Sequence, residues 1–490
     1  EQQFWHKGPH LKLPLRHDRG YTRQQIMKKA KLKIRNPRIP HTAEFAGNGR
    51  LKKNGSLEYI KIPVELKEEA GVRRRALVRM GFPLPQGALF QPDQIRLIDS
   101  DNREQRLQVS ITGFWPDQSV KWALLQFTAP LQANETVCYY VECGNRIQRN
   151  KFPDIKVKET RENIIIDTGK INAIIDKKKF NLIKELKFKG KSVGAFAAAG
   201  ATLRDAVTEQ DYSISGRPPR RIEISEAGPE RVTVRVEGQY WNGDRNLMDY
   251  VARLSFFSGL DGFELEFTHI NTELSHEFTD LLNLNLRFEP AGKIQAVKTH
   301  YDSDNTAGHI ACKRIFQETD QFLSIDGGRR ITGKFDGTAK LSCSDGNTWN
   351  IGIADAWKRY PKAFSWDSVF QLELLPAQPN RQFNRNLPYY LVYPFCEGAY
   401  RMKWGMAFTE RMRFEIQPET DGRVHAELNL PVIAVLPPEW YAKTKVLPGM
   451  GVKGFEAIDK KIVKSFEMRL RQEAEQREYG FFNYGDSFGE

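Results

Sequence analysis

The sequence predicts a mainly β protein: two β domains of unequal size, followed by a helical segment. From about residue 55 to residue 435, short runs of alternating apolar and polar residues are separated by Asp, Asn, Gly and Pro, the pattern of antiparallel strands and turns. After residue 436 the period changes, and apolar residues recur every four positions. We therefore expect a small β-barrel or sandwich, a large antiparallel β-sandwich and a C-terminal helix.

The N-terminal segment differs from the rest of the chain in its charge. Residues 1–55 carry 14 Lys and Arg against three Asp and Glu, so they hold +11 of the net charge of +13, and the other 435 residues hold only +2. Basic, Pro-containing sequence with little periodicity predicts a poorly ordered arm over residues 1–54. Because the rest of the chain is nearly neutral, we do not expect a nucleic-acid-binding domain. Attraction of the arm to an acidic polymer such as pectin is the alternative.

The periodic patterns divide the remaining chain into three parts. Residues 55–148 predict the small β domain, and residues 155–435 hold roughly 280 residues of antiparallel signal, which favours a large sandwich. Residues 436–490 begin with a Pro-containing linker and continue into an amphipathic helix of about five turns. The apolar positions of that helix are Ile458, Ile462, Phe466 and Leu470. The helix looks like the first element of a helical domain.

Residues 248–273 predict a long hairpin, with strands at Tyr250–Phe257 and Phe263–Glu273. On the second strand, period 2 places an apolar series and then His269 and Asn271 on one face. One interpretation is a half-buried strand whose His and Asn satisfy each other near an edge. The other is a β scaffold that presents His269, Asn271 and Arg253 to a polar ligand.

Several classes of site receive no support from the sequence. No run of about 18 apolar residues exists, so no membrane-spanning helix is expected. Nucleotide-binding, serine-hydrolase and zinc-protease motifs are missing, and the five cysteines form no CxxC pair. The nearest cysteine pair for a disulfide is Cys138 with Cys143. No metal ligands are assigned. The cluster Asp302, Asp304 and Asn305 resembles an incomplete acidic loop, so calcium is kept as the one cofactor alternative.

Seven stretches of the chain, in their order and spacing, resemble the YetA-like family that includes fungal exo-rhamnogalacturonan lyase. They are residues 76–89, 115–127, 252–273, 356–364, 393–414, 436–444 and 481–490. The resemblance implies a small N-terminal β-barrel, a central β-sandwich and then an α/α toroid, of which this chain holds only the start. It also implies a secreted protein, extracellular or periplasmic. The basic arm has no counterpart in the family.

The resemblance implies an enzyme, an exo-acting polysaccharide lyase that degrades pectin by β-elimination in rhamnogalacturonan or a related uronic-acid glycan. Such a reaction needs a group that neutralises the carboxylate, a base, and an acid for the leaving oxygen. His269 and Tyr484 are the catalytic candidates, and Arg253 or Asn271 is the candidate carboxylate clamp. The further substrate-binding candidates are Tyr400, Lys403, Trp404, Asn483 and Asp486.

Each of these patterns also has a structural explanation. Residues 400–404 could be strand edge and core packing, and residues 483–486 could be turn residues after a helix. At the level of the whole chain, the alternatives are a non-catalytic glycan-binding β-sandwich protein or a glycoside hydrolase, which would use two carboxylates. In either case we expect a monomer whose partner is an acidic polysaccharide or oligosaccharide.

Overall fold

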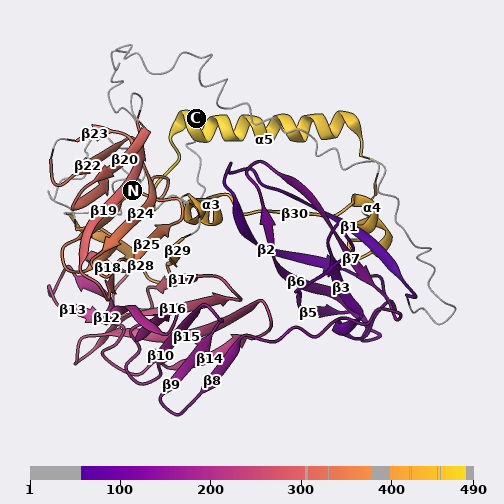
Figure 1. The fold of residues 1–490 in the computed structure, drawn as a ribbon. Coiled ribbons are helices and arrows are strands. Elements are labelled where there is room, and N and C mark those ends of the chain that lie inside the picture. The colour runs from indigo at the N-terminus through magenta and orange to yellow at the C-terminus, as the bar shows by residue number, and fades with distance from the viewer. Residues whose placement is uncertain are drawn as a thin grey trace. The chain divides into compact units, whose positions relative to one another are not determined.

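The structure is a computed structural model. It describes residues 57–303, 307–328, 330–377, 398–418, 420, 422–449, 451–452 and 454–481 (Figure 1). The predicted basic arm, two residues of the acidic cluster (Asp304 and Asn305) and the candidates Asn483, Tyr484 and Asp486 lie outside these ranges. Within them, no helix is long and apolar enough to span a bilayer.

The first β domain consists of two antiparallel sheets around one apolar core. The sheet orders are β30-β1-β7-β3-β4 and β2-β6-β5. The strands are β1 (Ile60–Lys67), β2 (Arg74–Pro83), β3 (Ile95–Ile98), β4 (Glu104–Gln105), β5 (Gln108–Phe114), β6 (Val120–Leu131), β7 (Thr136–Cys143) and β30 (Ala434–Val435), with a short 3-10 helix η1 (Pro92–Gln94) before β3. Alternation explains the core: in β1, Ile60, Ile62, Val64 and Leu66 are all buried.

The chain returns to this first domain after the sandwich is complete. β30 pairs with β1, and the short helix α4 (Pro438–Thr444) follows. Trp440 of α4 is fully buried, stacks on Phe82 with ring centroids 5.7 Å apart, and donates its indole N–H to the Pro83 carbonyl at 3.0 Å. These residues therefore complete the barrel core, whereas the sequence analysis placed them at the end of the sandwich and in a linker. Local periodicity could not show this, because Trp440 and Pro83 are 357 residues apart in the chain.

The second β domain runs from β8 to β29, and its strands pair antiparallel. Its first half is β8 (Lys156–Glu159), β9 (Asn163–Asp167), β10 (Ile171–Asp176), β11 (Glu185–Phe188), β12 (Lys191–Asp205), β13 (Asp211–Ser213), β14 (Arg221–Glu226), β15 (Arg231–Trp241), β16 (Asn246–Phe257), β17 (Gly262–Ile270) and β18 (Phe278–Pro290). Its second half is β19 (Ile294–Asp302), β20 (Ala307–Ala311), β21 (Arg314–Gln317), β22 (Phe322–Ile325), β23 (Ile331–Thr332), β24 (Lys334–Cys343), β25 (Thr348–Ile353), β26 (Lys362–Trp366), β27 (Phe370–Leu375), β28 (Tyr400–Lys403) and β29 (Ala407–Ile416).

The predicted central hairpin is β16 and β17, which pair along their length and with β29 on the other side of β17. The predicted alternation is confirmed. Phe263, Leu265, Phe267, His269 and Asn271 are buried, while the residues between them are partly exposed. The hairpin is therefore a central part of the sandwich core, and the apolar series ends in two buried polar side chains.

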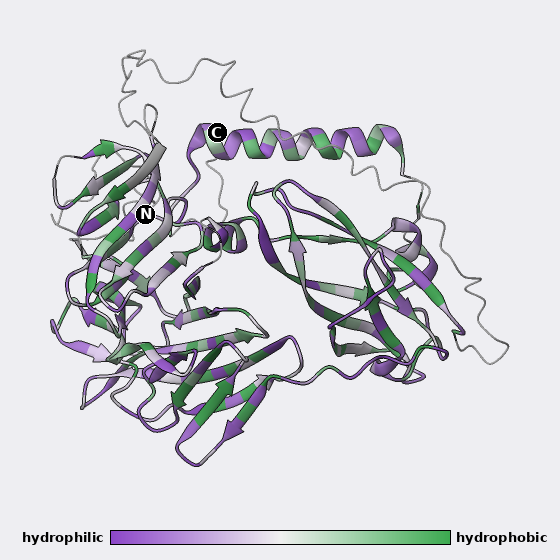
Figure 2. Cartoon of the chain, in the orientation of Figure 1, coloured by the Kyte–Doolittle hydropathy of each residue, from purple (hydrophilic) through white to green (hydrophobic). Residues whose placement is uncertain are grey.

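Besides α4, the described part of the chain after the sandwich holds the helices α3 (Arg423–Asn429) and α5 (Glu456–Gln476). In α3, Val424 and Leu428 cluster with Ala354. The predicted amphipathic helix is α5, and none of its residues is buried. Its apolar positions, Ile458, Ile462, Phe466 and Leu470, are 49–64 % exposed. Figure 2 shows hydrophobic bands along this largely hydrophilic helix.

Candidate functional site

Asn271, which directly follows β17, fixes the turn between β28 and β29. Its side chain is fully buried; the amide N–H donates to the Met402 carbonyl at 2.8 Å, and the amide oxygen accepts from the Thr279 hydroxyl at 3.1 Å. The Asn271 backbone N–H donates to Met406, and its carbonyl accepts from Gly405, both at 2.8 Å. Asn271 is thus a support for this turn rather than a group that can contact a ligand.

The turn that Asn271 fixes carries Lys403 and Trp404. Trp404 is 53 % exposed, and its backbone N–H donates to the Glu277 carbonyl at 3.0 Å. The Lys403 ammonium lies 3.5 Å from the Glu277 carboxylate, and both side chains are mostly exposed. The structure therefore brings three of the predicted site residues together: the buried Asn271 and, on the turn that it fixes, Lys403 and the exposed indole of Trp404. Such an amphipathic ring can pack on the apolar face of a sugar.

Tyr400, at the other end of β28, does not belong to this surface. It is fully buried, and its hydroxyl donates to the Pro376 carbonyl at 2.5 Å. The structural explanation, core packing, accounts for its contacts.

His269 lies in the core. It is fully buried, its Nδ1 is 3.0 Å from the Tyr240 hydroxyl, and its ring packs on Phe267 and Phe408 with centroids 4.4 and 4.8 Å away. Its Nε2 has no hydrogen-bond partner among the described residues. Burial lowers the pKa of His269 to about 3, because desolvation disfavours the charged imidazole. One interpretation of the sequence expected His269 and Asn271 to hydrogen-bond each other, but their partners are Tyr240 for His269 and Met402 and Thr279 for Asn271. The buried position of His269 also gives no support to its role as an accessible base.

Arg253 faces the other side of the sheet from His269 and Asn271. In the hairpin register Tyr250 stands opposite His269, whereas Arg253 stands opposite Glu266. Since neighbouring residues in a strand point to opposite faces, Arg253 cannot share a ligand with the other two. The prediction that His269, Asn271 and Arg253 present one site is therefore wrong, because Arg253 lies on the opposite face of the sheet.

A buried ionic cluster, which the sequence analysis did not identify, lies close to His269. Glu410 of β29 and Lys362 of β26 are each 1 % exposed, with the ammonium 3.3 Å from the carboxylate. Arg359 donates to the same carboxylate at 3.0 Å, and Lys362 also donates to the Leu374 carbonyl at 2.9 Å. A signal was present in the sequence. Glu410 occupies a position of β29 that alternation assigns to the core.

Both members of the pair have a pKa below the ordinary value, for different reasons. Burial lowers the pKa of Lys362 to about 8, against the pull of the Glu410 carboxylate. Burial also works to raise the pKa of Glu410, but Lys362 and Arg359 outweigh it and hold that pKa below its ordinary value. We infer a charged carboxylate held by two cations.

The chain after α5 returns to this cluster. Phe481 donates its backbone N–H to the Tyr360 carbonyl at 2.8 Å, and its ring lies 4.8 Å from the Lys362 ammonium and 4.4 Å from the Phe408 ring centroid. Arg477 donates to the Asp320 carboxylate at 2.8 and 2.5 Å. Described residues from four of the stretches that carry the family resemblance therefore lie close together: His269 (252–273), Lys362 (356–364), Phe408 and Glu410 (393–414) and Phe481 (481–490).

The described residues do not contain three His, Cys, Asp or Glu side chains grouped as metal ligands. The four described cysteines, Cys138, Cys143, Cys312 and Cys343, are free thiols. The Cys138–Cys143 disulfide considered from the sequence is therefore not formed.

Comparisons with known proteins agree with this architecture. Residues 66–140 match the PcRGLX-like N-terminal RIFT barrel domain, and residues 155–289 match the PcRGLX-like protein central beta sandwich domain. The uncharacterized protein YetA of Bacillus subtilis (strain 168) is 25% identical over 202 residues, 39% of this chain and 23% of that protein. The match thus spans less than a quarter of the relative's length.

Two solved structures show a more distant likeness. A glycosyl hydrolase family 38 protein from Enterococcus faecalis has a TM-score of 0.42 at 10% identity, over 77% of this chain and 47% of its own. A galactose mutarotase-like protein from Clostridium acetobutylicum has a TM-score of 0.33 at 12% identity, over 54% and 99%. At these scores the likeness carries no inference about function.

The fold and the matched domains define a β protein with a barrel, a central sandwich and few C-terminal helices, as the sequence predicted. Its two matched domains are of the kind found in rhamnogalacturonan lyase-like, carbohydrate-active proteins. The resemblance to the YetA-like, rhamnogalacturonan lyase-like family is thereby confirmed.

Proposed function

We propose that the protein acts on an acidic glycan, rhamnogalacturonan or a related uronic-acid polymer, as an exo-acting lyase that cleaves by β-elimination outside the cytoplasm. The observation that carries the glycan partner is Trp404, exposed beside Lys403 on the turn that Asn271 fixes. An indole on a rigid turn can stack on a sugar ring, and an adjacent ammonium can attract a uronate carboxylate.

The lyase reaction itself needs a base that reaches the substrate. His269 does not reach the surface, so Tyr484, outside the described residues, remains the predicted catalytic candidate, with Asn483 and Asp486 as predicted substrate contacts. In this proposal His269 and the Glu410–Lys362 pair are positioning groups beneath the site. The buried charges of the Glu410–Lys362 pair are hard to explain by stability alone, because ion pairs in a core are often no more stabilising than apolar residues.

The burial of His269 favours one alternative, a glycan-binding protein without catalysis. Incubation with rhamnogalacturonan fragments separates the two, because only β-elimination creates the unsaturated, ultraviolet-absorbing uronate product. Product formation supports the lyase. Saturable binding without product supports the alternative, and neither binding nor product contradicts both.

Trp404→Ala is expected to weaken binding of rhamnogalacturonan fragments by about fivefold to tenfold, from the loss of about 1–1.5 kcal/mol of ring packing. The unfolding transition should stay in place, because the side chain is already half exposed. Titration calorimetry on the variant measures the binding affinity, and thermal denaturation measures the unfolding transition. Phe114→Ala, which removes an equally exposed ring from β5 of the barrel, is the matched control and should leave binding unchanged. Equal affinity of the wild type and Trp404→Ala would contradict the platform.

A further inference from the structure

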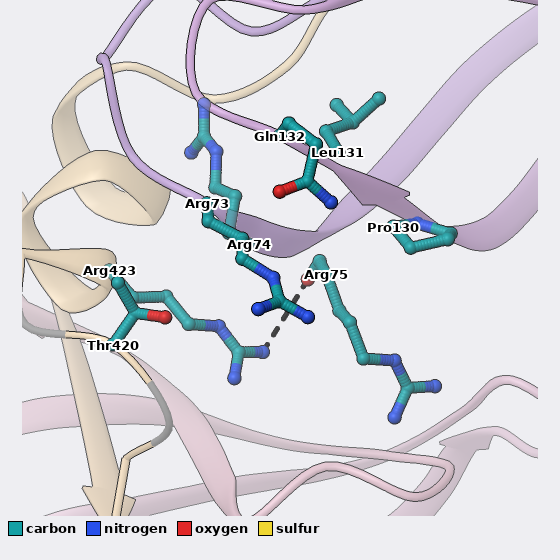
Figure 3. Close-up of a pocket in the computed structure, with 8 residues that line it drawn as sticks. All are labelled: Arg73, Arg74, Arg75, Pro130, Leu131, Gln132, Thr420 and Arg423. Atoms are coloured by element: carbon teal, nitrogen blue, oxygen red, sulfur yellow. Dashed lines mark hydrogen bonds between the residues drawn. The ribbon is translucent and has the colours of Figure 1, made fainter.

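A cavity of about 430 Å³ lies where β2 begins, and four arginines contribute to its wall (Figure 3). The lining residues are Arg73, Arg74, Arg75, Pro130, Leu131, Gln132, Thr420 and Arg423. A volume of this order is typical of small-molecule sites. The sequence analysis assigned no site to Arg73, Arg74 or Arg75, so this site comes from the structure alone.

Two of the four arginines are buried and incompletely satisfied. Arg74 donates to the Leu430 carbonyl at 2.8 Å and lies 3.0 Å from the Glu68 carboxylate, and Arg423 donates to the Arg75 carbonyl at 3.4 Å, the dashed line in Figure 3. The Nε and Nη1 atoms of Arg74 and the Nε atom of Arg423 have no hydrogen-bond partner in the described part of the chain. Buried donors without acceptors are costly, but these three atoms are covered by protein and do not themselves reach a ligand in the cavity.

Buried carboxylates lie close to both of these cations. Glu427 is 3.6 Å from Arg74, while Asp261 and Glu415 are 3.8 and 3.6 Å from Arg423. Burial raises the pKa of both Glu427 and Asp261. Burial also works to raise the pKa of Glu68 and Glu415, but backbone N–H donors and Arg74 outweigh it at Glu68, and Arg413 and Arg423 outweigh it at Glu415, so the pKa of both lies below the ordinary value. Arg74 and Arg423 therefore each have one charged carboxylate partner, which leaves Arg73 and Arg75 as the cations available to a ligand.

The other two arginines supply charge on the open side of the cavity. Arg73 is exposed, and Arg75 is half-buried with one Nη1–H···O bond of 3.0 Å to the Gly259 carbonyl. No described carboxylate forms an ion pair with Arg73 or Arg75. Figure 3 shows the side chains of Arg74, Arg75 and Arg423 extending to the same side, while the guanidinium group of Arg73 points away from the other three. Their planar forks are suited to bidentate binding of a carboxylate or another oxyanion.

We propose that this cavity is a carboxylate-binding site for one uronic acid unit of an acidic glycan, with Arg73 and Arg75 as the contact residues. The carboxylate class follows from the four arginines that line the cavity and from the absence of a described ion-pair partner for Arg73 and Arg75. The assignment to a sugar rests on the proposed function. Pro130 and Leu131 offer apolar wall for a ring face, and the Gln132 amide is a hydrogen-bonding group for hydroxyls.

The test is calorimetric titration of the full chain with galacturonic acid, with galactose as the neutral analogue and inorganic phosphate as the sugar-free anion. Galacturonic acid is expected to bind at least tenfold more tightly than either. Arg75→Gln is expected to weaken it by roughly tenfold to a hundredfold, the range of a lost charge-assisted hydrogen bond, and Arg73→Gln in the same direction. These two positions are chosen because the buried Arg74 and Arg423 could be needed for folding.

Arg79→Gln is the matched control, since Arg79 is an exposed arginine of the same strand outside the cavity and should leave binding unchanged. Equal affinity for galactose, phosphate preferred to galacturonic acid, or unchanged binding in Arg75→Gln would each overturn the proposal. The readout is binding of a free monosaccharide, which needs neither Trp404 nor cleavage. If the protein prefers galacturonic acid and Arg75→Gln weakens that binding, but no unsaturated product forms, then the lyase proposal is wrong and the carboxylate site stands.

Discussion

Glu410→Leu is expected to lower the free energy of unfolding by about 3–5 kcal/mol, the usual result of removing one partner from a buried ion pair. The carboxylate is 1 % exposed and accepts from Arg359 while facing the Lys362 ammonium at 3.3 Å. Without it, Lys362 would remain buried as an uncompensated cation or lose its proton. Urea denaturation of the variant and the wild type measures the difference.

The double variant Glu410→Leu/Lys362→Met tests the cause of that loss. With both charges replaced by apolar groups, most of the stability should return, because the cost lies in the unpaired charge rather than in the missing attraction. Glu456→Gln, which breaks an exposed pair with Lys460 on α5, should change stability by less than about 0.5 kcal/mol. A loss below about 1 kcal/mol in Glu410→Leu would show that the cluster is not an energetically coupled buried pair.

His269 is expected to make the protein sensitive to acid. Its folded pKa of about 3 lies below the ordinary value of 6.5. As the pH falls below about 6.5, the unfolded chain therefore takes up a proton that the folded chain refuses. Stability from this group is complete above that pH and is lost by about 1.4 kcal/mol for each pH unit on the way down towards pH 3.

His269→Phe, an apolar replacement of similar shape, should flatten the fall of unfolding free energy between pH 6 and pH 4, by about one proton in the slope. His276→Gln, a change at an exposed histidine, should keep the wild-type slope. Glu410 contributes its own acid sensitivity in the wild type and in His269→Phe alike. The difference between the slopes of these two proteins therefore reports the His269 imidazole. Identical slopes in His269→Phe and the wild type would contradict a neutral, buried His269.

The hairpin shows how far local pattern carries. Alternation alone predicted β16, β17 and the buried face that ends in His269 and Asn271, because burial on one side of a sheet imposes period 2. Register adds a further rule. Once the turn is placed, Tyr250 must face His269, so Arg253 must point the other way.

Other features depend on contacts between distant parts of the chain. Asn271 is held by Met402, 131 residues later, and Glu410 meets Lys362 from a different strand. Nothing in the neighbouring sequence specifies such partners. The arginine cavity likewise joins Arg75 to Arg423, 348 residues apart. The sequence alone shows which residue types are present in the candidate sites. Which of these residues contact each other can be seen only in the folded structure.

The return of β30 and α4 to the barrel has a consequence for synthesis on the ribosome. Phe82 and the Pro83 carbonyl are made early, but Trp440, which covers them, emerges only after the whole sandwich. The barrel must therefore wait, with part of its core open, while the later domain folds. A chain that stops short of residue 440 would leave that apolar surface bare, and would be a natural substrate for chaperones and proteases.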